Sequence, residues 1–133
     1  MREFNLEIIT PDGPFYSGSA LSVVARSSSG DVCVLAGHAD FLTTIDYGNV
    51  KIKTKEEERF ASVMGGFLSV SGGNVQIIAT TAEFAEDIDK ERAEKAKQRA
   101  EEMLKNKLSE NEMRLAEMKL KRALNRLSVS QKI

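Results

Sequence analysis

The sequence predicts an α+β fold, with an N-terminal antiparallel β-sandwich over residues 1–84 and a C-terminal antiparallel hairpin of two helices over residues 85–133. All glycines and prolines fall at or before Gly73, and all Phe and Tyr residues fall at or before Phe84. Glycine and proline mark turns and aromatic residues favour sheets, so their joint disappearance indicates a change to continuous helix. At the same place the apolar spacing changes from every second residue to every third or fourth.

Short alternating segments separated by turn residues predict the strands. Apolar and polar residues alternate from Phe4 to Ile8, and the TPDGP segment that follows predicts a turn. Similar segments recur, and one of them begins at Val50 after a YGN turn. The stretch 60–80 is expected to give three strands, broken at a Gly-Gly pair and at a tight SGGN hairpin. Many short strands with turns are typical of a sandwich or a small barrel.

Two apolar stripes with three- and four-residue spacing predict the helices. The first stripe contains Ala85, Ile88, Ala96, Ala100, Met103 and Leu104. The second contains Ala116, Leu120, Ala123, Leu124 and Leu127. Between them, Ser109 followed by Glu112 is a capping box, which starts a new helix after a short connection. Because alanine dominates the first stripe, its burial gains little free energy, and we expect a weakly docked hairpin that can detach.

The charge is divided unevenly between the two parts. Residues 1–84 contain 6 Lys and Arg against 10 Asp and Glu, whereas residues 85–133 contain 13 against 10. This small basic excess favours docking on acidic protein surfaces and argues against nucleic-acid binding. No stretch approaches the roughly 20 apolar residues of a membrane span, and no leader is visible, so we expect membrane association only through partners.

Single copies of cysteine and histidine argue against a metal centre or a disulfide framework, which need several ligands or paired cysteines. Cys33 lies in the apolar run DVCVLAG and is interpreted as a small buried hydrophobe. His38, in a glycine-bounded turn, is interpreted as structural or as a contact residue. The chain has no GxxxxGK[ST] loop and no evident pair of nucleophile and base, so the sequence predicts no catalytic residues and no enzyme.

Five segments resemble the epsilon subunit family of bacterial F-type ATP synthases, especially its Bacillus group. They are TPDGP at 10–14, GH at 37–38, GGFLSV at 65–70, AEDIDKERA at 85–93 and MKLKRALNRLSV at 118–129. One departure concerns the Gly-His turn, where the family usually has flanking prolines and this chain has Ala36 and Asp40. Because proline fixes φ and alanine does not, this departure weakens the expectation of a rigid loop.

The resemblance implies a non-catalytic subunit of the rotor, or central stalk, peripheral to the cytoplasmic face of a bacterial membrane. The sandwich would bind the gamma subunit and the c-ring, the latter through Gly30, Asp31 and His38, which would share one loop surface. The hairpin would either fold on the sandwich or extend toward the alpha and beta subunits and block ATP hydrolysis. The basic residues that would contact the beta subunit are Arg114, Lys119, Lys121, Arg122 and Arg126. A positive helix among carboxylates gains stability as water is excluded.

The segment IDKERA at 88–93 has two interpretations. Asp87 and Asp89 favour the positive end of a helix, so a capped helix start accounts for them without a ligand. The arginines of the two helices share faces by their spacing, and an antiparallel hairpin could bring them to one anion. The resemblance implies a regulatory ATP site formed by Glu83, Ile88, Asp89, Arg92, Ala93, Arg99, Arg122 and Arg126. Any Mg²⁺ would enter with ATP, because the spacing shows no dedicated carboxylate cage.

Two alternatives stay open beside an ATP-sensing rotor subunit. The first is the same rotor subunit with a hairpin that binds no ATP usefully and responds to rotation and membrane energisation. The second, from another class, is a free-standing β-sandwich adaptor with a coiled-coil-like helical pair. Calorimetric titration with ATP tests the first alternative, and co-purification with a gamma subunit tests the second.

Overall fold

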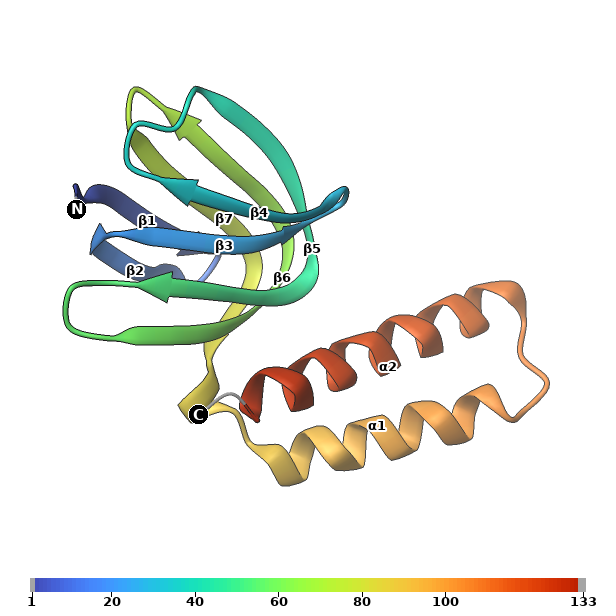
Figure 1. Ribbon diagram of the computed structural model, residues 1–133. Helices are drawn as coiled ribbons and strands as arrows, with labels where there is room; N and C mark the ends of the chain where they lie inside the picture. The colour runs from blue at the N-terminus through green and yellow to red at the C-terminus, as the bar shows by residue number, and fades with distance from the viewer. Residues whose placement is uncertain (1, 132–133) are drawn as a thin grey trace.

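The computed structural model describes residues 2–131 and confirms an α+β fold with the sandwich first and the helical hairpin second (Figure 1). Met1 and residues 132–133, which belong to the predicted ranges 1–84 and 85–133, lie outside the described residues. The elements in chain order are β1 Phe4–Thr10, β2 Gly13–Ala20, β3 Ser22–Ser27, β4 Gly30–Leu35, β5 Phe41–Lys53, β6 Glu58–Ser71, β7 Asn74–Phe84, the 3-10 helix η1 Ala85–Asp87, α1 Lys90–Leu104 and α2 Glu110–Ser130.

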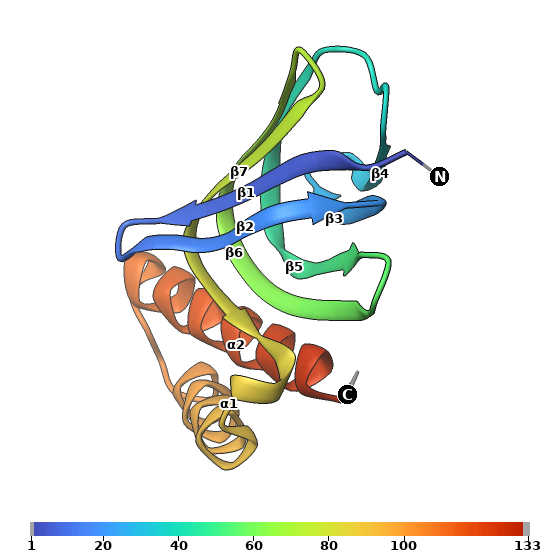
Figure 2. The ribbon, with the colours of Figure 1, turned by 90° about the vertical axis from the view of Figure 1, so that its left-hand side faces the viewer.

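The strands form one sheet that folds over itself into a sandwich. Their order across the sheet is β2-β1-β7-β6-β5-β3-β4, and the long strands β5 and β6 bend strongly between its two layers (Figure 2). Alternate residues of each strand point into the enclosed core, as the period-two pattern requires. Core residues with at most 1% exposure include Leu6, Ile8, Val23, Ile52, Leu68 and Ile77.

One strand pairing departs from the predicted antiparallel arrangement. β1 pairs antiparallel with β2 on one side, but parallel with β7 on the other, where Leu6 lies opposite Val75 and Ile8 lies opposite Ile77. A tight hairpin joins only antiparallel strands, whereas β1 and β7 are connected through the whole of the intervening sheet. Their direction is therefore set by how the sheet closes and not by a local turn.

Two predicted breaks are wrong, because the chain runs through them as continuous strands. β6 passes through Gly65 and Gly66, whose φ angles are 65° and 143°. A Cβ at Gly66 would collide with the carbonyl oxygen of Ile78 on β7, so glycine permits close strand approach here. β5 likewise runs through the YGN segment, where Gly48 lies against the side chain of Arg26. The stretch 60–80 therefore gives two strands, joined by the predicted SGGN hairpin.

The first helix begins later than its apolar stripe predicts. Ala85 lies in η1 and Ile88 lies in the extended segment after it, and both are buried against Val129 of α2. Asp89 then caps α1, because its carboxylate accepts a hydrogen bond from the backbone N–H of Arg92 at 3.0 Å. This bond confirms the predicted capped start and places the first two apolar residues before the helix.

The hairpin docks on the sandwich through its second helix. α2 begins with the predicted capping box of Ser109 and Glu112. It packs on β5 and β6, and α1 packs on α2 (Figures 1 and 2). The two helices meet through small side chains, of which the buried ones are Ala93, Ala100, Ala116 and Ala123. Each alanine buries little apolar area, so its burial contributes little free energy to the packing of α1 on α2.

The prediction that Cys33 is buried is wrong. Cys33 lies on β4, at one edge of the sheet, and is exposed. Successive residues of a strand face opposite sides, so the fully buried Val34 places Cys33 and Leu35 on the solvent side.

Candidate functional site

A cavity of about 640 Å³ lies where the hairpin meets the sandwich. Its apolar wall consists of Met64, Ala82, Ala96, Ala100, Met103 and Ala123, and its polar wall consists of Thr81, Glu83, Arg99, Lys119, Arg122 and Arg126. These residues come from β6, β7 and both helices, so the cavity exists only while the hairpin is folded. Four cations against one carboxylate make its potential positive.

Glu83 and Arg126 join the sandwich to α2 across this cavity. The Nε and Nη2 atoms of Arg126 donate hydrogen bonds to the two carboxylate oxygens of Glu83, at 2.9 and 3.0 Å. Both side chains are partly shielded, with 23% and 32% exposure. A two-pronged pair of this kind has both directional and electrostatic strength. It fixes α2 on β7 and neutralises the only carboxylate of the cavity wall.

The other three cations of the cavity lack acidic partners. Arg99, Lys119 and Arg122 form no ion pair with any residue that the structure describes. Lys119, Arg122 and Arg126 share one face of α2 by their three- and four-residue spacing, and Arg99 reaches the same cavity from α1. Several positive groups around one cavity attract an anion, and guanidinium groups suit phosphate.

The structure brings together half of the residues expected at the ATP site. Glu83, Arg99, Arg122 and Arg126 line the cavity, but the four residues of the 88–93 segment are outside its wall. In that segment Ile88 is buried in the apolar cluster at the root of the hairpin and Ala93 is buried on α1. Asp89 caps α1, and Arg92 is exposed. Three of these four positions therefore have structural roles in the folded hairpin. Sequence analysis missed Lys119 as a cavity residue, although its spacing from Arg122 and Arg126 could have indicated it.

A second set of polar contacts holds α2 on β5 and β6, outside the cavity wall. Lys121 Nζ donates to Asp46 Oδ1 at 3.1 Å and lies 5.2 Å from the centre of the Tyr47 ring. Asn125 Nδ2 donates to the Gly48 carbonyl oxygen at 3.2 Å and to Ser62 Oγ at 2.9 Å. A hydrogen bond from the Tyr47 backbone N–H and another from Lys121 lower the pKa of Asp46. The carboxylate of Asp46 is thus stabilised in its charged form while α2 is docked.

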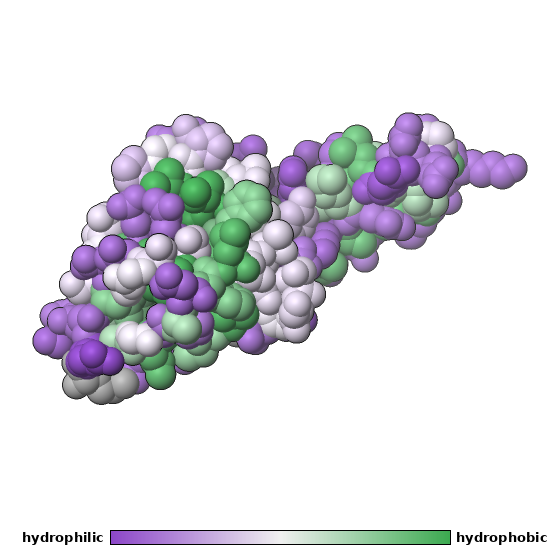
Figure 3. Space-filling model, turned by 90° about the horizontal axis from the view of Figure 1, so that it is seen from above, coloured by the Kyte–Doolittle hydropathy of each residue, from purple (hydrophilic) through white to green (hydrophobic). Residues whose placement is uncertain are grey.

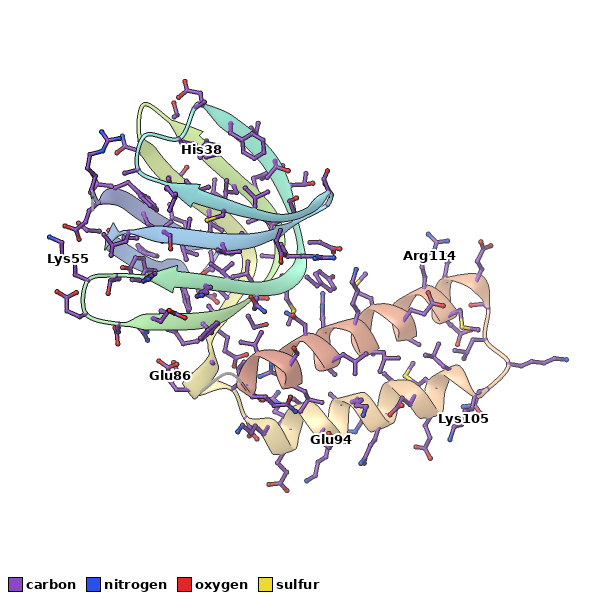
Figure 4. The ribbon with its side chains drawn as sticks, viewed as in Figure 1. His38, Lys55, Glu86, Glu94, Lys105 and Arg114 are labelled. Atoms are coloured by element: carbon purple, nitrogen blue, oxygen red, sulfur yellow. The ribbon has the colours of Figure 1, made fainter. Side chains whose placement is uncertain are left out.

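The junction between sandwich and hairpin has its own ion pair. Arg59 Nη2 donates to Glu86 Oε1 at 2.7 Å, and the guanidinium carbon lies 3.5 Å from the centre of the Phe84 ring. Figure 4 labels Glu86 at this junction, where the chain leaves β7. The hydrogen bond from Arg59 lowers the pKa of Glu86. These contacts fix the root of the hairpin independently of its helices.

The residues expected to contact a beta subunit differ in what the folded hairpin leaves accessible. Lys121 and Arg126 are paired with Asp46 and Glu83 of the sandwich, and two others line the cavity. Arg114 lies toward the outer end of the hairpin, away from the sandwich (Figure 4). Folding therefore pairs Lys121 and Arg126 with the sandwich and directs Lys119 and Arg122 to the cavity.

The residues expected at the c-ring do not share one loop surface. Gly30 and Asp31 begin β4, whereas His38 follows its far end, so the strand length of about 17 Å separates them. Asp31 forms an ion pair with Arg26 at 3.3 Å. His38 lies at the end of the sandwich remote from the hairpin (Figure 4). A single partner touching all three would have to extend along β4.

The loop from Ala36 to Asp40 is tied down in spite of its missing prolines. The Asp40 carboxylate accepts a hydrogen bond from the Gly72 backbone N–H at 3.1 Å, which joins this loop to the β6–β7 turn. The His38 backbone N–H donates to the Leu35 carbonyl oxygen at 3.2 Å. The aspartate thus replaces the rigidity of proline with a cross-strand hydrogen bond.

Hydrophobic side chains gather on the sandwich surface that faces the viewer in Figure 3. The exposed large apolar residues of the sandwich are Leu35, Phe41, Leu42, Phe67 and Ile78, with exposures of 38% to 70%. Phe67 and Ile78 lie opposite each other on neighbouring strands. Exposed apolar side chains that gather on one surface are typical of a protein-binding face.

Within the described residues, no group of His, Cys, Asp and Glu side chains is arranged to hold a metal ion. None of the helices in the described part of the chain is long and apolar enough to cross a membrane.

The two parts of the chain match two family models. Residues 3–85 match the β-sandwich domain of the ATP synthase delta/epsilon chain, and residues 86–131 match the long α-helix domain of the same chain. The chain therefore belongs to the ATP synthase delta/epsilon chain family.

Known relatives agree with this assignment over the full length. The chain is 42% identical to the ATP synthase epsilon chain of Bacillus velezensis over 130 residues, which is 98% of each protein. It is 42% identical to that of Bacillus pumilus over 132 residues, with 99% and 100% covered. Among solved structures, it resembles a chain of the Euglena gracilis mitochondrial ATP synthase complex of OSCP, F1 and c-ring. That match has a TM-score of 0.83 at 22% identity and covers 92% of this chain and 78% of the other. At that identity the likeness shows the fold.

Proposed function

We propose that this chain is the epsilon subunit of an F-type ATP synthase, a non-catalytic part of the central stalk that also restrains ATP hydrolysis. Support comes from the full-length similarity to Bacillus epsilon chains and from the fold shared with a chain in a complex of F1 and c-ring. The exposed apolar face of the sandwich would bind the gamma subunit, and the His38 end would approach the c-ring. The chain would then be peripheral to the cytoplasmic face of the membrane.

The cavity between hairpin and sandwich carries the regulatory part of this proposal. It contains three cations that have no acidic partner within residues 2–131, and its walls are completed only by the folded hairpin. A ligand that binds only this state stabilises it by RT ln(1 + [L]/Kd), which is about 2.7 kcal/mol at a hundredfold excess over Kd. ATP provides phosphates for the cations and a base for the alanine- and methionine-lined wall. High ATP would then keep the hairpin folded.

Folding and inhibition would compete for the same side chains. Lys121 and Arg126 pair with the sandwich, while Lys119 and Arg122 face the cavity. When the hairpin extends, these cations become available to carboxylates of a beta subunit, and hydrolysis stops. Bound ATP would therefore oppose inhibition both by stabilising the fold and by masking part of the basic set.

One observation favours a second candidate, the same rotor subunit without useful ATP binding. Arg126 is already neutralised by Glu83, and Asp89, expected at the ATP site, is engaged as a helix cap. A nucleotide would have to bind with three free cations or displace existing bonds. The hairpin would then respond to rotation and membrane energisation alone.

Two measurements test the proposal. Calorimetric titration of the folded protein should give heat at millimolar ATP, and no heat would favour the second candidate. In the assembled synthase, truncation after Asp87 should preserve coupling and abolish inhibition of hydrolysis. A truncated subunit that inhibits as strongly as the full chain would contradict the division of roles between sandwich and hairpin.

A further inference from the structure

We propose that Lys119 binds the third phosphate of the nucleotide, so that the cavity distinguishes a triphosphate from a diphosphate. This inference rests on the proposed ATP binding and deepens it. Its spacing places Lys119 on the same face of α2 as Arg122 and Arg126. The structure adds that this face lines the cavity, where Lys119, Arg99 and Arg122 have no acidic partner among the described residues.

The cations of α2 form a row along the cavity. Arg126, Arg122 and Lys119 follow one another at four- and three-residue spacing, so they extend along the helix axis by about 10 Å. Arg99 faces this row from α1. A chain of linked phosphates placed along the row would meet one positive group after another.

The single carboxylate of the cavity gives this row a direction. Glu83 is bonded to Arg126 at one end, at 2.9 and 3.0 Å, and cancels the charge there. Phosphate oxygens are repelled by a carboxylate and attracted by the unbalanced cations, so the phosphates should lie toward Arg99, Arg122 and Lys119. Lys119 is the last cation of the row on α2. Only the longest phosphate chain should reach it.

A lysine is chemically suited to this end of the row. Its ammonium group is a compact charge on a flexible stem with three donors, so it can follow the terminal phosphate without a fixed planar fit. The side chain is exposed and has no ion pair among the described residues, so no existing bond has to break. The same exposure means that its replacement should not disturb the fold.

The test compares affinities for ATP and ADP, measured by calorimetry on the full chain. Lys119→Ala should weaken ATP binding about tenfold and ADP binding by less than about twofold, because only ATP reaches the missing ammonium group. Lys119→Arg should largely restore the preference for ATP. Lys107→Ala is the matched control, since Lys107 is an exposed lysine in the connection between the helices, outside the cavity wall. It should leave both affinities unchanged, and thermal unfolding should show that all variants are folded.

The outcomes separate this inference from the proposed function. If Lys119→Ala weakens the binding of ATP and ADP equally, or the binding of neither, Lys119 does not contact the third phosphate. The proposed binding of ATP is not contradicted by that result. If the wild type binds inorganic tripolyphosphate but not ATP, the proposed regulatory ATP binding is wrong. A selective loss of tripolyphosphate over pyrophosphate in Lys119→Ala would then still support the role of Lys119. If the wild type binds neither ATP nor tripolyphosphate, both proposals are wrong.

Discussion

The sandwich and the hairpin are stabilised by different kinds of interaction. The sandwich encloses one continuous apolar core, to which every strand contributes at least one buried apolar side chain. The hairpin has four buried alanines between its helices and a small apolar cluster at its root. Its attachment to the sheet combines this cluster, against which Phe60 of β6 packs, with polar bonds from Lys121, Asn125 and Arg126.

This difference explains how one small chain can contain a constant part and a movable part. Burial of apolar surface is non-directional and is nearly insensitive to ions, so the sandwich keeps its structure under varied conditions. Polar bonds exchange with water and with other charges at a small net free-energy difference. A hairpin attached by polar bonds can therefore respond to an anion, a partner or the pH while the sandwich remains folded.

The largest expected effect comes from the core of the sandwich. Leu68 is fully buried on β6, so Leu68→Ala should lower the free energy of unfolding by about 3 kcal/mol through lost burial and a residual cavity. Leu42→Ala is the matched control, because Leu42 is 70% exposed, and its effect should stay below about 0.5 kcal/mol. Urea denaturation monitored by circular dichroism measures both. Equal effects would contradict the assignment of stability to the core.

The second effect concerns the bond between Glu83 and Arg126. A double-mutant cycle with Glu83→Ala and Arg126→Ala should give a coupling of about 1.5 kcal/mol, more than a fully exposed pair would give and less than a buried one. The readout is docking of the hairpin and not global unfolding. The exposed Cys33 allows one dye to be placed on the sandwich, and Lys107→Cys allows a second on the hairpin. A coupling near zero would assign the docking to other contacts.

The sequence could predict features that are set locally, but not those set by contacts between distant segments. The period-two pattern and the turn residues predicted the sandwich, and the stripes and caps predicted two helices, because these signals are local. The predicted strand breaks at Gly65-Gly66 and at YGN were wrong. Glycine is required both in tight turns and where a strand closely approaches another strand or its side chains, and here it serves the second purpose. The parallel pairing of β1 with β7 joins residues about 70 positions apart, and no local pattern records it.

The candidate site shows the same limit. Spacing alone correctly placed Arg122 and Arg126 on one face of a helix. It could not show that Arg99, and not Arg92, reaches the cavity with them, because this depends on how the two helices meet. Spacing also indicates that Lys119 shares this face of α2, but whether the face lines a cavity depends on how both helices pack on the sheet. Asp89 could be recognised as a helix cap from the local sequence, whereas Glu83 was assigned to the site only through the family resemblance.

The third expected effect concerns the helix cap that Asp89 forms at the start of α1. Asp89→Ala removes the acceptor for the Arg92 backbone N–H and should destabilise the first turn of α1 by about 1 kcal/mol. Hydrogen exchange should then speed up in α1 and stay unchanged in β6 and β7, because local opening of the hairpin does not expose the core. Asp87→Ala is the control, since Asp87 lies before the cap in η1. Faster exchange in the strands would mean that the two parts unfold together.

The smallest expected effect is a dependence of docking on pH through Asp46. The folded-state pKa of this carboxyl lies below its ordinary value of 3.8, because of hydrogen bonds from the Tyr47 N–H and from Lys121. The Tyr47 bond lies within β5, so only the lowering due to Lys121 is linked to docking. That stabilisation is complete well above pH 3.8 and is lost as the pH falls through the pKa of the docked state. Since the pair is partly exposed, its loss should weaken docking by only about 0.5 kcal/mol.

Dye-pair measurements between pH 6 and pH 3 check this effect, in buffers of about 0.1 M ionic strength to limit screening differences. Asp46→Asn should remove the pH-dependent component and give weaker docking at every pH, because the amide cannot form an ion pair with Lys121. Glu86, whose pKa is also lowered, lies at the junction and not under α2. Glu86→Gln should therefore leave the pH dependence of docking that Asp46 causes unchanged. If docking in wild type and Asp46→Asn changes identically with pH, the Asp46–Lys121 pair does not contribute to docking, which then depends on the Glu83–Arg126 pair, the Asn125 hydrogen bonds and the apolar contacts.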